Sequence, residues 1–147
     1  MGMRKQYEDN KSLRNERWFA EEVGKWFGVT LHKLPKQYGL DFIAKKKGSV
    51  YAFLELKNRT CTKNQYGTYI ISLSKYLKAK LIYQFLGART LLCVKWTDQS
   101  GSVCLSDLES DQLDISIGGR YDRDDWQDVE PLINIDISNF NVIGEKH

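Results

Sequence analysis

The chain has 147 residues, of which 41% are hydrophobic and 28% are charged, and its formal net charge is +3. This length favours a single domain with one core, because domains of about 100–150 residues are the commonest. No stretch approaches the roughly 20 consecutive apolar residues of a membrane-spanning helix, so we expect no membrane partner. Residues 1–11 lack the apolar segment of a signal peptide, so we expect a cytoplasmic protein.

Charge is distributed unevenly along the chain. Residues 1–97 contain 19 Lys and Arg against 7 Asp and Glu, a net charge of +12, whereas residues 98–147 contain 3 against 12, a net charge of −9. A basic segment neutralises phosphates and releases counterions, so it favours a nucleic acid as partner. A lysine-rich solvated surface would give the same count, so charge alone does not decide between the two.

The first expected element is a helix that begins near Asn10 or Ser12 and ends near Phe27, just before Gly28. Its apolar face consists of Phe19, Ala20, Val23, Trp26 and Phe27. Glu16 precedes Phe19 by three residues and Ala20 by four, so it continues this face. None of the residues at helical spacing from Glu16 is basic. We therefore interpret Glu16 as an acid with a functional role rather than as a surface charge.

A hairpin is expected after an extended segment over Val29 to Leu34. Its strands are Leu40 to Lys46 and Val50 to Lys57, joined by a turn at Lys47-Gly48-Ser49. If the turn is centred on Gly48, facing residues have numbers that sum to 96, and Asp41 lies opposite Glu55. Lys57 shares the face of Glu55, and Leu54 and Leu56 point to the other face. A register slip of one residue would separate Asp41 from Glu55.

The elements that follow suggest a mixed central sheet flanked by helices, an α/β fold. Residues 58–69 read as a polar loop with room for one short strand, and Ser72 to Leu86 as a helix. The residues expected on the buried face of this helix are Leu73, Leu77, Leu81 and Phe85. Further strands are expected over 89–96, 102–105 and, as a late edge strand, 131–137, with an exposed loop over 121–128. Three separated cysteines are interpreted as reduced thiols, two of them in strands.

If Asp41 and Glu55 face each other, their carboxylates repel, and burial beside Ile43 and Phe53 makes both charges costly. A divalent cation resolves this conflict, and carboxylate oxygens with spare water positions suit Mg²⁺ or Mn²⁺. Such an ion polarises a phosphoryl oxygen and lowers the pKa of a bound water, as phosphodiester hydrolysis requires. Lys57 could orient or deprotonate the water, or stabilise transition-state charge, and the sequence does not decide between these roles.

The spacing of Asp41, thirteen intervening residues, and Glu55-Leu56-Lys57, with Glu16 on a preceding helix, resembles the PD-(D/E)XK nuclease superfamily. That superfamily includes restriction enzymes and Holliday-junction resolvases, and the resemblance covers roughly residues 13 to 95. It implies a restriction-endonuclease-like αβββαβ core, metal binding by Glu16, Asp41 and Glu55, and a catalytic Lys57. Leu40 stands where the superfamily often has a proline.

Taken together, the sequence predicts a single nuclease domain over 1–147, with a core over about 13–105 and an acidic C-terminal extension over about 106–147. We expect a metal-dependent endonuclease acting on DNA rather than RNA, including branched or repair substrates, and an acidic extension that lies away from the substrate or narrows its channel. Phosphate contacts are expected from Arg59, Lys63, Lys75 and Lys78.

Two other functions fit the same sequence. One is a non-catalytic nucleic-acid-binding module of the same fold, and the other is an inhibitory protein whose acidic tail mimics a nucleic acid. The sequence leaves the oligomeric state open and is compatible with a homodimer.

Overall fold

A computed structural model describes residues 3–109, 113–119 and 129–144. The first part of the chain forms, in order, α1 (Met3–Phe27), β1 (Thr30–Lys33), β2 (Phe42–Lys46), β3 (Ser49–Asn58), β4 (Thr68–Ser72) and α2 (Leu73–Leu86). The second part forms β5 (Arg89–Lys95), β6 (Ser100–Cys104), β7 (Asp114–Gly119), β8 (Val129–Asp136) and β9 (Asn141–Ile143). Short 3-10 turns lie at η1 (Lys36–Tyr38), η2 (Leu105–Asp107) and η6 (Ile137–Asn139).

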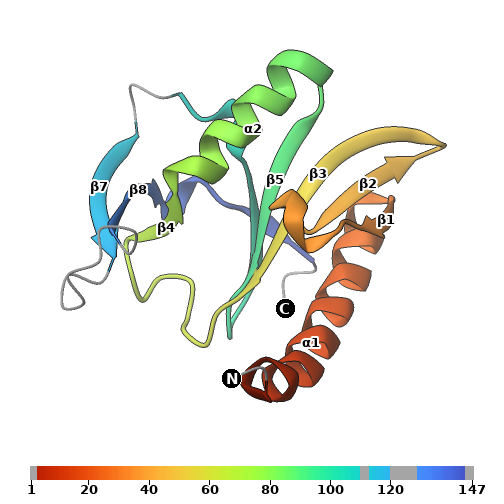
Figure 1. Cartoon of the computed structure of the whole chain (residues 1–147), viewed down its shortest axis with the longest axis horizontal. Helices are drawn as coiled ribbons and strands as arrows, with labels where there is room; N and C mark the ends of the chain where they lie inside the picture. Colours follow the sequence, from red (N-terminus) through yellow and green to blue (C-terminus); the bar gives the residue numbers. More distant parts are fainter. Residues whose placement is uncertain (1–2, 110–112, 120–128, 145–147) are drawn as a thin grey trace.

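The strands form two sheets (Figure 1). The larger has six strands in the order β1-β2-β3-β5-β6-β9, and the smaller has three in the order β4-β8-β7. The pair β3 and β5 is parallel and the other pairs of the large sheet are antiparallel, so the sheet is mixed. Apart from β4, which belongs to the small sheet, the order α1, β1, β2, β3, α2, β5 is the αβββαβ core expected from the sequence.

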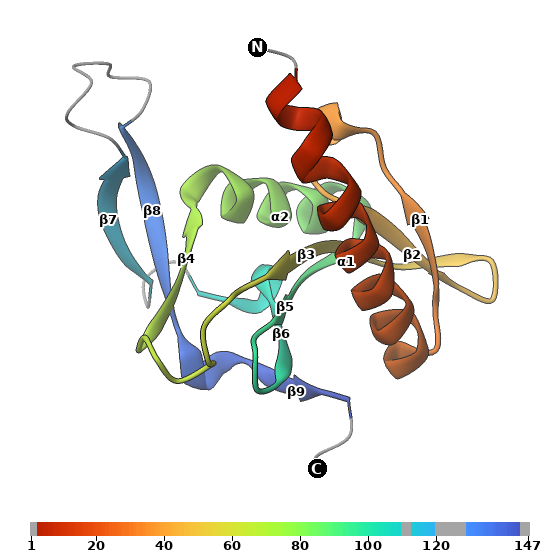
Figure 2. The same cartoon turned by 90° about the horizontal axis from the view of Figure 1, so that it is seen from below.

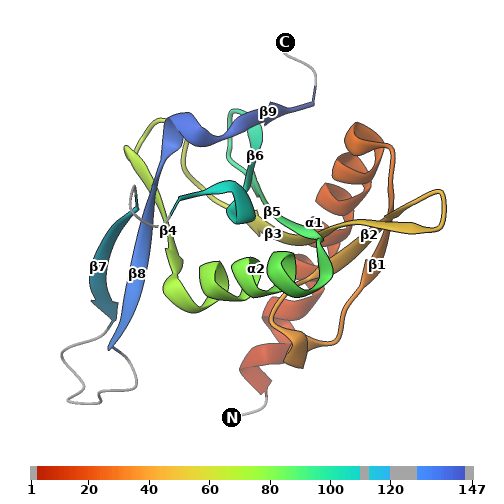
Figure 3. The same ribbon diagram turned by 90° about the horizontal axis from the view of Figure 1, so that it is seen from above.

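The two helices cover opposite faces of the large sheet (Figure 2, Figure 3). On one face, Phe19 and Val23 of α1 pack against Leu54 and Leu56 of β3. On the other, Ile82 of α2 packs against Phe53 of β3 and Leu40. Alternate residues of β3 therefore lie under different helices, and both faces of the strand are buried. Glu55 has the parity of Phe53, so it lies on the α2 face.

The hairpin reaches the expected register through a β-bulge. Its turn has only two residues, Lys47 with φ 51° and Gly48 with φ 81°, and Lys46 pairs with Ser49. A two-residue turn with both φ angles positive matches the twist of the flanking strands. Between the pairs Lys45↔Val50 and Ala44↔Ala52, β3 contains one additional residue, Tyr51. This residue shifts the pairing by one position. From Ala44 to Phe42, the numbers of paired residues therefore sum to 96, which confirms the predicted register.

The first helix ends as expected, because Phe27 is its last residue and Gly28 follows with φ 67°. Its start was predicted wrongly, since α1 begins at Met3 instead of near Asn10 or Ser12. Among its apolar residues, Phe19, Ala20 and Val23 are buried, whereas Trp26 is half exposed.

The second helix has the predicted length but the wrong predicted buried face. Of the four residues predicted to be buried, Leu73 packs against the core, whereas Leu77, Leu81 and Phe85 are 49%, 52% and 75% exposed. The buried residues are instead Tyr76, Ala79 and Ile82. The sequence contains two apolar stripes on this helix, and periodicity cannot tell which one meets the sheet. Ala79 has no exposed surface, and its small side chain allows the helix to lie close to the sheet.

The C-terminal segment supplies part of the core. Strand β8 lies in the middle of the small sheet, so the expected edge strand is an inner strand, and Ile133 and Ile135 have no exposed surface. Strand β9 pairs with β6, and Phe140 packs against Tyr69. Strands β7 and β9 were not anticipated because they are short or follow unclear patterns. The loop predicted over 121–128 lies outside the described residues.

The cysteine prediction holds in the described part of the chain. The three cysteines are free thiols, and Cys93 and Cys104 lie in strands. Among the described helices, none has the length and apolar character needed to span a membrane.

Candidate active site

Strand β3 places Glu55 and Lys57 on the face covered by α2. Glu55 is 2% exposed, although acidic side chains are seldom buried without a partner. The side chain of Lys57, two residues later, is 46% exposed. The face shared by these residues is the one predicted from the two-residue period of a strand. The carboxylate of Glu55 is therefore buried, whereas the ammonium group of Lys57 is accessible to solvent.

Asp41 lies one residue before β2, next to β3. Its backbone N–H donates to the carbonyl of Leu54 at 3.1 Å, and its Oδ2 accepts from the backbone N–H of Leu56 at 2.8 Å. The regular strand pairing ends at Phe42 and Leu54. Asp41 therefore does not form the ladder pair with Glu55 that the sequence predicted. A side-chain to backbone hydrogen bond takes the place of the next ladder bond and holds the carboxylate against β3.

Two lysines approach the carboxylate of Glu55. The ammonium group of Lys75 on α2 forms an ion pair with Oε1, and the Nζ of Lys57 lies 3.4 Å from the same oxygen. These cations offset the cost of placing a negative charge in the interior. The other oxygen, Oε2, is buried and has no hydrogen-bond partner among the described residues. The carboxylate thus keeps one oxygen without a protein partner.

This donor set fits a divalent cation that prefers oxygen ligands. Oε2 of Glu55 and the carboxylate of Asp41 are hard oxygen donors from neighbouring strand positions. Within residues 3–109, 113–119 and 129–144, no three acidic, histidine or cysteine side chains lie close enough to form a ligand cluster. Asp41 and Glu55 would hold the ion, with waters and substrate oxygens completing its coordination.

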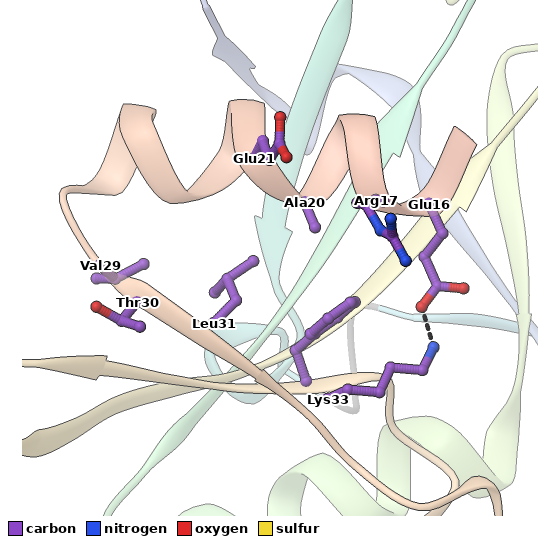
Figure 4. A pocket seen from close by; sticks show the side chains of 9 residues that line it. Glu16, Arg17, Ala20, Glu21, Val29, Thr30, Leu31 and Lys33 are labelled. Atoms are coloured by element: carbon purple, nitrogen blue, oxygen red, sulfur yellow. Dashed lines mark hydrogen bonds and ion pairs between the residues drawn. The ribbon is translucent and has the colours of Figure 1, made fainter. Parts of the chain in front are cut away.

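The structure does not bring Glu16 together with Asp41 and Glu55. Glu16 lies on α1, which covers the opposite face of the sheet, and its carboxylate forms an ion pair with Lys33 of β1 (Figure 4). Both residues line a groove of about 600 Å³ between α1 and β1, together with Leu31 and Phe42. Helical spacing does not reveal Lys33 as the partner of Glu16, because Lys33 lies on a strand. A metal-binding role for Glu16 stays a prediction.

The four basic residues expected to contact phosphates lie in different surroundings. The guanidinium of Arg59 lies over the ring of Tyr69 at 4.8 Å from its centroid. The backbone N–H of Lys63 donates to Asp98 at 3.0 Å. Lys78 donates to the carbonyl of Tyr38 and lies over its ring. Lys75 is the exception, because its ammonium group points to Glu55.

Lys75 is the residue whose place in the site was missed from the sequence. Sequence reasoning assigned it to a phosphate-binding surface, together with Lys78. A signal was present, because Lys75 precedes Ala79 by four residues and Ile82 by seven, so the three share one helical stripe. This is the stripe that meets the sheet. A cation on it must lie near the sheet or find a buried partner.

Comparisons with known proteins bear on the family and the fold of the chain. The profile of the family named "Phage putative PDDEXK endonuclease" matches residues 2–143. Among solved structures, the chain resembles Hjc, a Holliday junction resolvase from the archaeal hyperthermophile Archaeoglobus fulgidus, with a TM-score of 0.57 and 16% sequence identity. The match covers 88% of this chain and 87% of Hjc. At this identity it supports the fold alone. No curated protein sequence gives a significant match.

Proposed function

Because the chain belongs to the family of phage PDDEXK endonucleases, we propose that it hydrolyses DNA phosphodiester bonds with Mg²⁺ or Mn²⁺ at Asp41, Glu55 and Lys57. The observation that carries this proposal is the buried carboxylate of Glu55. One of its oxygens is approached by two lysines, and the other has no partner among the described residues. A purely structural role would not need a buried acid with a free oxygen beside a second acid.

Each residue has a distinct role in this proposal. Asp41 and Glu55 hold the divalent ion, and the hydrogen bond from the Leu56 N–H fixes the direction of the Asp41 carboxylate. When bound, the ion polarises a phosphoryl oxygen and lowers the pKa of the attacking water. Lys57 is exposed enough to meet the substrate, and its ammonium group stabilises the negative charge that develops on the phosphoryl oxygens.

The nucleic acid contacts the basic surface next to this site. Arg59 and Lys63 lie in the loop between β3 and β4, and we assign them contacts to phosphates that do not read the base sequence. Lys78 lies on α2 and donates to the carbonyl of Tyr38. DNA is proposed as the substrate, and a four-way junction belongs in the assay because the structural neighbour Hjc is a Holliday junction resolvase.

Mn²⁺ titration of two Asp41 variants tests the metal site. Asp41→Asn keeps an oxygen that can accept from the Leu56 N–H but removes the charge, whereas Asp41→Ala removes both. Both should lose Mn²⁺ binding and cleavage, while Asp41→Asn retains wild-type stability. Asp107→Asn, a change at an exposed acid paired with Arg89, serves as the matched control. Unchanged Mn²⁺ affinity in both Asp41 variants would place the metal elsewhere.

Cleavage should be measured on duplex, four-way-junction and single-stranded DNA and on RNA, with Mg²⁺ and with Mn²⁺. The proposal requires metal-dependent cleavage of at least one DNA substrate. If wild-type protein binds these nucleic acids and cleaves none of them, the non-catalytic binding module becomes the better account.

A further inference from the structure

A second pocket lies at the end of β3, beyond the proposed catalytic residues. It has a volume of about 340 Å³, within the usual range of about 300–1,000 Å³ for ligand pockets. The loop after β3 supplies one wall and strand β4 supplies another. Trp96, the residue that follows β5, also lines the pocket. The side chains that matter for its chemistry are Arg59, Lys63, Tyr66, Tyr69 and Trp96.

The lining combines aromatic rings with cations. Tyr66 is a large aromatic residue, yet it is 61% exposed, so its ring is accessible to a ligand. The guanidinium of Arg59 lies over the ring of Tyr69. Aromatic rings and guanidinium planes are the surfaces on which unpaired nucleobases stack, and the positive charges attract the neighbouring phosphates. This combination fits a nucleotide better than a bare phosphate, which would not need the rings.

One wall carries a buried hydroxyl group. Tyr69 is 95% buried, and within the described residues its hydroxyl forms no well-aligned hydrogen bond, although the guanidinium of Arg59 lies close enough to interact with it. A base edge offers both donors and acceptors, so it could satisfy such a group. Burial raises the pKa of Tyr69, Arg59 opposes this rise, and the carboxylate of Glu55 adds to it. Arg59, which lines the pocket, lies two residues after Lys57, so the pocket is close to the proposed catalytic residues.

We propose that this pocket binds one unpaired nucleotide of the substrate, next to the phosphate that is cut. The base stacks on Tyr66 with its edge towards Tyr69, and Arg59 and Lys63 hold its phosphates. A base inside an intact duplex would first have to be unstacked and unpaired, which an unpaired base does not require. The protein therefore prefers DNA with an unpaired nucleotide at a branch, bulge or end. This inference rests on the proposed function.

Binding of two labelled duplexes tests the pocket without any cleavage. Each duplex carries 2-aminopurine at its centre, unpaired as a one-nucleotide bulge in one and paired with thymine in the other. Affinities are measured by fluorescence anisotropy in EDTA at low salt, and stacking is measured by quenching of 2-aminopurine. The test variant is Tyr66→Ala. The matched control is Tyr83→Ala, a change at an exposed tyrosine on α2 that lies outside the pocket.

Wild-type protein should bind the bulged duplex about tenfold more tightly and quench its fluorescence, as stacking of one base allows. Tyr66→Ala should bring the ratio of the two affinities to within about twofold and abolish the additional quenching. Tyr83→Ala should behave as wild type. If wild-type protein shows no preference for the bulged duplex, or if Tyr83→Ala loses this preference as much as Tyr66→Ala does, the proposed nucleotide pocket is wrong.

The two proposals fail in different ways. Metal-dependent cleavage of paired DNA without any preference for the bulge would reject the nucleotide pocket and leave the nuclease function intact. Preference and quenching that depend on Tyr66, in a protein that cleaves nothing with Mg²⁺ or Mn²⁺, would keep the pocket and reject the nuclease function. Absence of all nucleic-acid binding would reject both.

Discussion

Lys75 on α2 forms an ion pair with Glu55 on β3, a residue twenty positions earlier in the chain. The side chain of Lys75 is 31% exposed and that of Glu55 only 3%, so the contact lies mostly in the interior. Lys75 and a divalent ion would both be attracted to the same carboxylate. The negative charge of Glu55 therefore contributes both to the stability of the metal-free protein, through Lys75, and to the metal affinity of the site.

Replacing Lys75 by Met should have opposite effects on these two properties. The variant keeps most of the length of the side chain but leaves Lys57 as the one cation paired with Glu55 among the described residues, so the metal-free protein should be destabilised. Breaking a buried pair costs about 3–5 kcal/mol, and we expect about 2–3 kcal/mol because Lys75 is partly exposed. Mn²⁺ should bind more tightly, since a competing cation is gone. Urea denaturation and Mn²⁺ titration measure the two effects.

Lys25→Met, a change at an exposed lysine of α1, is the control for the loss of one positive charge. It should change neither property. Weaker Mn²⁺ binding in Lys75→Met than in wild type would show that Lys75 supports the metal site instead of competing with it.

Replacing Lys57 by Ala should slow the chemical step without weakening substrate binding. The ammonium group is mostly needed when negative charge develops in the transition state, and loss of one such partner typically costs about 10²–10³ in rate. Single-turnover cleavage with saturating protein measures this step, and anisotropy measures binding. Lys45→Ala, at an exposed position of β2, should cleave at the wild-type rate. A wild-type rate for Lys57→Ala would refute its catalytic role.

The small sheet should be essential for folding, although two of its three strands, β7 and β8, come from the segment predicted to be an extension. Ile133 on β8 and Ile115 on β7 are register partners on one face, yet Ile133 has no exposed surface and Ile115 is 53% exposed. Ile133→Ala should cost about 2–5 kcal/mol, and Ile115→Ala less than about 1 kcal/mol. Thermal or urea denaturation compares them. Equal costs would mean that β8 does not contribute to the core as described.

A chain that ends before Gly118 loses β8 and β9 and, with them, the buried residues Ile133, Ile135 and Phe140. We expect this truncation to unfold, so it cannot serve to test whether the acidic segment repels the substrate. Circular dichroism of the truncated chain would settle the point, and a native-like cooperative transition would contradict it.

Cys93 should resist alkylation in the folded protein. Burial raises the pKa of its thiol to about 12, so the reactive thiolate is almost absent at pH 8.5. Because the folded state favours the protonated thiol, this group contributes stability that is present below about pH 9 and is lost as the pH rises towards 12. Mass spectrometry after iodoacetamide treatment should find Cys61 modified before Cys93. Equal rates for these two cysteines would contradict this burial.

Sequence alone determined the face of β3 that carries the chemistry. Alternation along a strand is a property of the local backbone, so Phe53, Glu55 and Lys57 had to share a face once β3 was a strand. The end of the first helix at Gly28 was also readable, because a left-handed residue that ends a helix is a local signal.

Register and helix rotation were decided by the tertiary structure. The sequence argument assumed a turn centred on Gly48, whereas the two-residue turn alone would pair residues whose numbers sum to 95. The bulge at Tyr51 restores the sum of 96, because burial of Phe53 under α2 and Leu54 under α1 fixes which residues of β3 face each helix. In the same way, contacts with the sheet select the stripe of Tyr76, Ala79 and Ile82 on α2 and thereby bring Lys75 to Glu55. Such choices depend on contacts between residues far apart in the chain, which local periodicity does not contain.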